Sequence, residues 1–195
     1  MRRRKGLDFR KKPKKKISNV FIRELLSWIF IILISAFIGV VVTFVWGTQT
    51  VVYSNSMEPG LYAGQKVLVN KLVYSISEPK RNEVIAFLPN GNEKSHYYVK
   101  RVIGLPNETV KITDGYIYID GVRLDEGGRY DKIADPGMLE VEVKLSDNEY
   151  IVLGDNRNFS EDSRSGNIGI VKGEYILGKV WFKFSDELDS IGFVK

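Results

Sequence analysis

Residues 25–46 read LLSWIFIILISAFIGVVVTFVW, twenty-two consecutive residues without a charged side chain. As an α-helix this segment would be about 33 Å long, at about 1.5 Å per residue, and would cross a hydrocarbon core of about 30 Å. A cleavable secretory signal has a shorter apolar core and a small-x-small ending, whereas this run ends in Trp46-Gly47-Thr48-Gln49. The stretch therefore predicts an uncleaved transmembrane signal-anchor helix that divides the chain into a short and a long part.

The short part before the helix carries the chain's positive charge. Residues 1–24 contain eleven Lys and Arg and two acidic residues, which leaves eighteen Lys and Arg against twenty-two Asp and Glu in the remainder. Basic residues gather on the cytoplasmic side of a membrane span. The tail therefore predicts a cytoplasmic N-terminus, with residues 47–195 outside the cytoplasm. Because the body is mildly acidic, we expect it to bind no nucleic acid.

The chain has few side chains that bind metals. It contains no cysteine, so a disulfide framework and a thiolate metal site are both excluded. Its single histidine, His96, leaves little room for a site built from imidazoles. The prediction is that this protein holds no metal.

Beyond the helix, short apolar runs alternate with turn signals. We expect strands at 50–53, 66–72, 83–88, 97–104, 109–112, 116–122, 140–144, 150–154 and 178–184. A hairpin turn is expected at Asp120-Gly121, and a short helix at 173–176. This spacing predicts a mainly β fold, an antiparallel sheet of sandwich or barrel type. Residues from about 113 to 149 are richer in charge, Gly and Pro, and we interpret them as an inserted β subdomain.

Directly after the predicted helix comes Tyr53-Ser54-Asn55-Ser56-Met57-Glu58-Pro59-Gly60. Ser54 and Ser56 are two residues apart, so they project to the same side of an extended chain. Pro59 and Gly60 then turn the chain away. Such a junction is commonly only a loop, and a serine nucleophile also needs a neighbouring general base.

Lys100 is a candidate for that base. A lysine accepts a proton only when it is neutral, so its usual pKa of about 10.4 must fall by roughly 3 units, which burial among apolar groups can achieve. On an alternating strand Tyr98, Lys100 and Val102 share one face, which places the amine against an apolar layer. The alternative is an exposed lysine at a strand edge. His96 follows a polar segment, where we expect it to be exposed.

A third stretch, GDNRNFSEDSRSG at 154–166, follows an apolar strand. It is either a solvated surface loop or a loop that holds hydroxyl and charged groups around a site.

Together the three stretches resemble the type I signal peptidases, or bacterial leader peptidases, which are membrane-anchored Ser-Lys proteases. The resemblance rests on residues 54–59, 98–106 and 154–164, on their order, and on the spacing of forty-four between Ser56 and Lys100. It covers roughly residues 25–184, and the short insert and single span resemble the compact form found in Gram-positive bacteria. It implies a single-pass protein of the bacterial cell membrane with an extracytoplasmic catalytic domain.

The resemblance also implies roles for single residues. Ser56 would be the nucleophile and Lys100 the general base, in a dyad that needs no cofactor. The Ser54 hydroxyl and the Ser56 backbone N–H would form the oxyanion hole. Three residues would orient and support the lysine: Ser160, Asp162 and Arg164. Three more would contact the substrate: Met57, Tyr98 and Val99.

The family's partners are secretory pre-proteins and the lipid bilayer. The resemblance implies that a signal peptide with small-x-small residues before the cleaved bond is added as a β-strand beside residues 50–54 and 97–99. The sequence does not determine the oligomeric state. Three residues depart from the family pattern and bear on specificity or loop geometry: Gly60, Asn158 and Phe159.

Three other functions are alternatives to this one. Ser77-Glu78-Pro79-Lys80 and Ser146-Asp147-Asn148 fit two motifs of penicillin-binding enzymes, but the third motif, K-T-G, is missing and Pro79 is unfavourable in the helix that S-x-x-K opens. Self-cleaving repressor proteases share the Ser-Lys chemistry but require a DNA-binding domain. A membrane-anchored β-sheet binding module would be non-enzymatic, and its Lys100 would titrate like an ordinary lysine.

Overall fold

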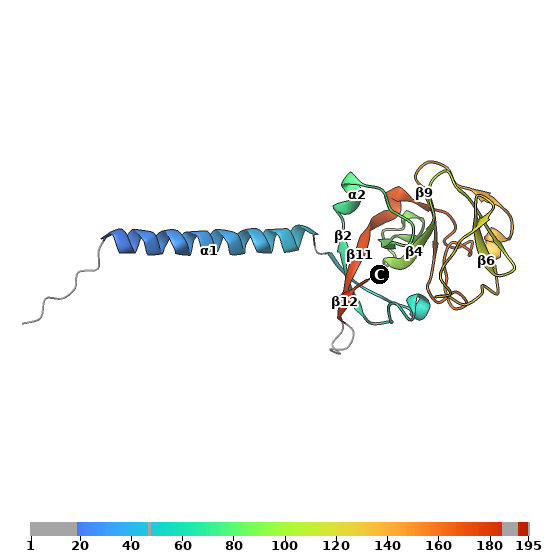
Figure 1. Ribbon diagram of the computed structural model, residues 1–195, viewed down its shortest axis with the longest axis horizontal. Helices are drawn as coiled ribbons and strands as arrows, with labels where there is room; N and C mark the ends of the chain where they lie inside the picture. Colours follow the sequence, from blue (N-terminus) through green and yellow to red (C-terminus); the bar gives the residue numbers. More distant parts are fainter. Residues whose placement is uncertain (1–18, 47, 185–190, 195) are drawn as a thin grey trace, which may run out of the picture. The chain divides into compact units, whose positions relative to one another are not determined.

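The computed structural model describes residues 19–46, 48–184 and 191–194, and it separates into two units, Met1–Val42 and Thr43–Lys195 (Figure 1). Helix α1 (Asn19–Trp46) begins six residues before the predicted span. Its segment Val20–Val42 is long and apolar enough to cross a membrane. The predicted basic tail falls largely in residues 1–18, outside the described residues.

The second unit is mainly antiparallel β-structure, which confirms the predicted fold class. Its larger sheet has eight strands in the order β1-β2-β11-β3-β4-β9-β10, with β12 paired to β11. Their bounds are β1 Thr48–Val51, β2 Lys66–Asn70, β3 Val84–Phe87, β4 Tyr98–Gly104, β9 Glu149–Leu153, β10 Val171–Lys172, β11 Ile176–Phe184 and β12 Gly192–Phe193. Among the described strands, β1 and β10 form the two ends of this order, so hydrogen bonding does not close the sheet into a barrel.

A smaller sheet has the order β7-β6-β5-β8, and in Figure 1 its strand β6 lies at the end of this unit away from β2 and β11. The bounds are β5 Thr109–Thr113, β6 Tyr116–Ile119, β7 Val122–Arg123 and β8 Val143–Lys144. Strands β5 and β6 form one hairpin of this sheet, and strands β6 and β7 form the next. Each hairpin turns on an Asp-Gly pair in which both residues have a positive φ: Asp114-Gly115 in the first and Asp120-Gly121 in the second. Two successive positive φ values suit the tight turns that match the twist of a hairpin.

The predicted strand at 140–144 is mostly wrong. Only Val143 and Lys144 pair with β5, while Gly137–Glu140 forms the short 3-10 helix η3. This turn buries Leu139 completely, and Val141 is 67% exposed, so the alternating valines do not define one buried face. The remaining short helices are η1 Asn55–Met57, α2 Val73–Ile76, η2 Pro89–Gly91 and η4 Gly173–Tyr175.

The centre of the larger sheet is buried on both faces. Val84 and Ala86 of β3 pack in one apolar cluster with Met57 and Val99, and Ile85 packs in another. The backbone of Lys100 in β4 is paired directly opposite Ile85. The strand that carries the candidate base is therefore held inside the sheet, where a charged side chain loses most of its hydration.

Candidate active site

Ser56 and Lys100 are in direct contact. Ser56 lies in η1, five residues after Val51 at the end of β1, and Lys100 lies in β4. Both are buried, with 4% and 3% of their surfaces exposed, and the Lys100 Nζ donates a hydrogen bond of 2.5 Å to the Ser56 Oγ. A primary amine at this distance from a hydroxyl can take its proton if the amine is neutral.

The surroundings of Lys100 favour the neutral amine. Tyr98 and Val102, on the same face of β4 as predicted, both pack in the cluster around Ile85, and the Nζ lies 5.7 Å from the centre of the Tyr98 ring. Burial lowers the pKa of Lys100 to about 8, although the carboxylates of Asp162 and Glu161 act in the opposite direction. The amine therefore titrates close to neutral pH and not near its ordinary value.

Ser54 is the second hydroxyl beside the candidate nucleophile. It is the residue before η1, has extended backbone angles, and is exposed. Its Oγ donates a hydrogen bond of 2.9 Å to the Ser56 Oγ.

Asp162 organises the loop that follows β9. Its side chain is completely buried and accepts a hydrogen bond from the Gly154 N–H at 3.0 Å. The Nε and Nη2 of Arg164 each donate to the Asp162 carboxylate at 2.8 Å. Because charge-assisted, two-point pairs of this kind fix geometry, the two residues close the loop onto the end of β9.

Ser160 lies inside this loop. Its Oγ is buried and, among the described residues, has no hydrogen-bond partner. The resemblance implies a hydrogen bond from Ser160 to the lysine, but the bond that Lys100 makes here is to Ser56. The structure thus places Ser160 at the site without joining it to Lys100.

Gly154 allows the first and third stretches to pack closely. A Cβ at this position would collide with the Ser160 side chain and with the Ser56 carbonyl. That same carbonyl accepts a hydrogen bond of 3.1 Å from the Asn156 N–H. The backbone of the candidate nucleophile is therefore held directly by the segment after β9.

Sequence reasoning missed the buried pair of Arg101 and Asp155. The Arg101 Nε and Nη2 donate to the Asp155 carboxylate at 2.7 and 2.6 Å, and both residues are at most 6% exposed. Two features of the sequence pointed toward this site: Arg101 directly follows Lys100, and Asp155 directly follows Gly154. This pair fixes β4 against the same loop that Asp162 closes.

The structure also explains two departures from the family pattern. A Cβ on Gly60 would lie 2.7 Å from the Asp155 Oδ2, so glycine leaves room for that carboxylate. The Asn158 side chain accepts from the Ala134 N–H and donates to the Lys132 carbonyl, at 2.9 and 3.1 Å. Asn158 thereby connects the loop that follows β9 to residues 132–134, which precede η3.

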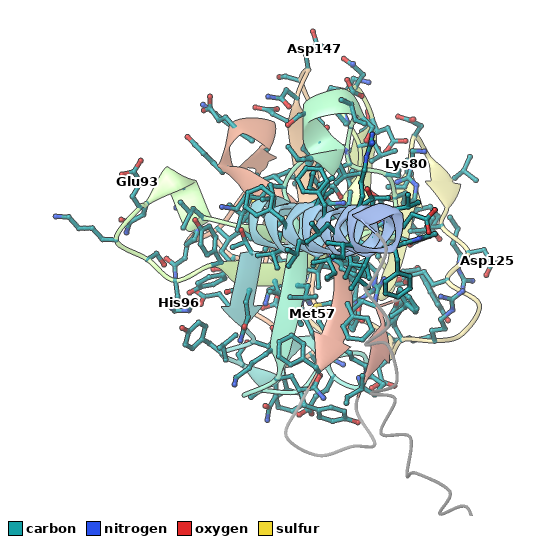
Figure 2. All side chains as sticks on the ribbon, turned by 90° about the vertical axis from the view of Figure 1, so that its left-hand side faces the viewer. Met57, Lys80, Glu93, His96, Asp125 and Asp147 are labelled. Carbon is teal, nitrogen blue, oxygen red and sulfur yellow. The ribbon has the colours of Figure 1, made fainter. Side chains whose placement is uncertain are left out.

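A groove of about 400 Å³ opens beside the dyad. Its lining comes from three segments of the chain: Val52, Tyr53, Ser54 and Ser56; His96, Tyr97, Tyr98, Val99 and Lys100; and Phe159 and Glu161. Two of the three residues predicted to contact the substrate, Tyr98 and Val99, are part of this lining. Met57 differs, because η1 turns its side chain into the core, where it is fully buried (Figure 2). His96 is exposed, as expected, with its ring stacked on Tyr98.

The motif Ser77–Lys80 does not form a comparable site. Helix α2 ends at Ile76, so Ser77 follows a helix and does not open one. Ser77 and Lys80 are both exposed. Within the described part of the chain, no group of three or more His, Asp or Glu side chains is placed to hold a metal ion.

Comparisons with known proteins identify the family of this chain. The family model described as "Signal peptidase, peptidase S26" matches residues 22–185. A signal peptidase I of Bacillus licheniformis is 31% identical over 168 residues, which covers 83% of this chain and 89% of the relative. A probable signal peptidase I-2 of Synechocystis is 38% identical over 136 residues, 67% of this chain, and this match spans 60% of the relative's length.

A crystal structure of a signal peptidase I from Enterococcus faecalis V583 is 31% identical to this chain. The likeness covers 54% of this chain and 98% of that one, with a TM-score of 0.41. The assignment rests on the family model, which matches most of the chain, and on the Bacillus relative. This chain belongs to the signal peptidase family, peptidase S26, and is a serine peptidase of the signal peptidase I type.

Proposed function

We propose that Ser56 and Lys100 are the catalytic dyad of an endopeptidase that removes signal peptides from secretory pre-proteins at small-x-small sites. The observation that carries this proposal is the hydrogen bond of 2.5 Å between the Lys100 Nζ and the Ser56 Oγ. The burial that lowers the pKa of Lys100 to about 8 supports it. Neither feature is expected of a surface lysine in a binding module.

In the proposed mechanism, neutral Lys100 takes the proton of Ser56 while the Oγ attacks the scissile carbonyl carbon. The oxyanion of the tetrahedral intermediate is stabilised by the Ser54 hydroxyl and the Ser56 N–H. When the C–N bond breaks, Lys100 gives its proton to the departing amine of the mature protein. Lys100 then deprotonates a water that attacks the ester, and Ser56 regains its proton as the signal peptide leaves with a new carboxyl end.

The groove supports binding of the substrate as an extended strand. Its walls are residues 52–54, which follow β1, and residues 96–99, of which the last two are the first residues of β4. An extended peptide between them could bond to backbone groups on either side, as in β-augmentation. Side chains would then point alternately toward and away from the groove, which fits recognition of two small residues separated by one unrestricted residue.

The N-terminal helix and its basic flank support a topology with the N-terminus in the cytoplasm. Ser56 comes ten residues after Trp46, the end of α1, and ten extended residues span at most about 35 Å. The dyad would therefore stay near the outer surface of the bilayer. A signal peptide that spans the same membrane would present its cleavage site at that surface.

The test is cleavage of a pre-protein with an Ala-x-Ala site by the full chain in liposomes. Ser56→Ala and Lys100→Met should each lower the rate by at least about 10³-fold, because catalytic groups that act as a unit lose most of the rate together. Lys94→Met, at an exposed position outside the groove, should cut like the wild type. Full activity of Lys100→Met would refute the dyad, and an inert wild type would favour the binding module.

A further inference from the structure

Two residues of the groove have no role in the chemistry described above. Phe159 and Glu161 flank Ser160, and both line the groove that holds the dyad. Phe159 is 80% exposed, which leaves a large apolar ring in water at the groove's edge. Glu161 is also exposed, and its Oε1 accepts a hydrogen bond of 2.9 Å from the Asn167 Nδ2. The carboxylate is thus held in place but still open to a ligand.

Glu161 determines the charge of the groove in its working state. The other charged residue of the lining is Lys100, which must be neutral to act as a base. Asp162 is buried and bonded to Arg164, outside the lining. The Glu161 carboxylate is near enough to Lys100 to act on its pKa. With Lys100 neutral, the Glu161 carboxylate gives the groove a negative charge.

An apolar ring beside a carboxylate suits one type of ligand side chain. Lysine and arginine bury an aliphatic stem on apolar surface while the charged end stays at a polar partner. An arginine can also stack its guanidinium on an aromatic face. An aspartate or glutamate in the same place would meet a like charge, which disfavours it.

We infer that Phe159 and Glu161 form a subsite for a basic side chain of the pre-protein close to the cleaved bond. The inference rests on the proposed function of the groove and adds a charge preference to it. Phe159 contacts the stem of the basic side chain, and Glu161 pairs with its cationic end. The subsite therefore favours pre-proteins with Lys or Arg near the cleavage point over those with Asp or Glu.

The experiment measures cleavage by the full chain in detergent. The substrates are Ala-x-Ala peptides that carry Lys, Gln or Glu at one of three positions. These are the x of Ala-x-Ala and the first and second residues after the cleaved bond. For at least one position, wild type should cut the Lys peptide about three- to ten-fold better than the Glu peptide in kcat/KM, as expected for exposed charge pairs. Glu161→Gln should bring this ratio close to one, and Glu161→Lys should invert it.

Two further variants separate the subsite from general effects. Phe159→Ala should lower kcat/KM for the Lys peptide at that position more than for an Ala peptide. Glu93→Gln is the matched control, because Glu93 is also exposed but does not line the groove and projects away from the strands (Figure 2). It should leave the Lys-to-Glu ratio at its wild-type value.

A ratio near one at all three positions, or a ratio that Glu161→Lys leaves unchanged, would overturn the subsite. In either case cleavage of the Gln peptide by wild type and not by Ser56→Ala would leave the proposed function intact. A wild type that cuts none of the peptides would instead refute the proposed function, and the subsite with it.

Discussion

Lys100 in β4 contacts Ser56 in η1 although forty-four residues separate them in the chain. The neighbours of both residues explain the contact. Met57, which follows Ser56, and Val99, which precedes Lys100, pack in the same buried cluster. The distance between amine and hydroxyl is therefore set by core packing, which holds more firmly than a surface loop does.

Replacement of the lysine should stabilise the fold. Because burial lowers the pKa of Lys100 from 10.5 to about 8, the unfolded chain binds this proton more tightly than the folded one. Below pH 8 this costs the wild type up to about 3 kcal/mol, and the cost disappears as the pH rises to 10.5. Lys100→Met removes it, so the variant should resist urea better at pH 7.

The same measurement at two pH values provides the check. The advantage of Lys100→Met should shrink between pH 7 and pH 10.5, since other titrating groups are common to both proteins. Lys94→Met, at an exposed position, should show no such change. An inactive Lys100→Met that is less stable than wild type at pH 7 would mean that the amine is not desolvated.

Gly154→Ala should lower the rate of cleavage by about 10²-fold or more. The added Cβ would collide with the Ser160 side chain and the Ser56 carbonyl, and so push the nucleophile's backbone away from the loop. A displacement of about 1 Å is enough to cost about 10²-fold in rate. Gly166→Ala lies in the same loop, where a Cβ meets nothing within 4 Å, and should keep its activity. Equal rates for the two variants would show that this close packing is unimportant.

Asp162→Asn should destabilise the domain by about 3 kcal/mol. The change leaves the Arg164 guanidinium without its carboxylate, and breaking one side of a buried pair typically costs this much. Asp147→Asn makes the same chemical change at an exposed carboxylate and should cost less than about 0.5 kcal/mol. Urea unfolding of both variants tests this. Similar midpoints would indicate that the Asp162–Arg164 pair does not brace the loop.

Ser54→Ala should lower kcat by about 10²- to 10³-fold with little change in KM, because an oxyanion donor acts in the transition state. The hydroxyl is exposed, so the variant's resistance to urea should match that of wild type. Steady-state kinetics with a peptide substrate separate the two parameters. A raised KM with unchanged kcat would place Ser54 in substrate binding and not in the oxyanion hole.

Much of the fold could be predicted because the strands are apolar runs between strong turn signals. The hairpin at Asp120-Gly121 is one example, since few pairs other than Asx-Gly adopt two positive φ values easily. Strands β10 and β12 have two residues each, too few for any periodicity to show. The segment 140–142 alternates like a strand, but the burial of Leu139 places it in a turn.

The site was predictable only in part. Tyr98 and Val102 in the sequence indicate the apolar face on which Lys100 lies. The pair of Arg101 and Asp155 could not be inferred, because charged residues in a polar motif suggest a surface loop. The two residues are fifty-four positions apart in the chain, and their charges pair only once the fold brings them together. The inward turn of Met57 likewise depends on η1, which the sequence pattern does not show.

The central claim is that Lys100 acts as a neutral base with a lowered pKa. The most direct measurement is kcat/KM of the full chain in detergent on an Ala-x-Ala peptide between pH 5 and pH 10. A base with a pKa of about 8 predicts a rate that rises tenfold per pH unit below pH 8 and levels off above it. A rate that keeps rising toward pH 10.5, or that does not depend on pH, would contradict the claim.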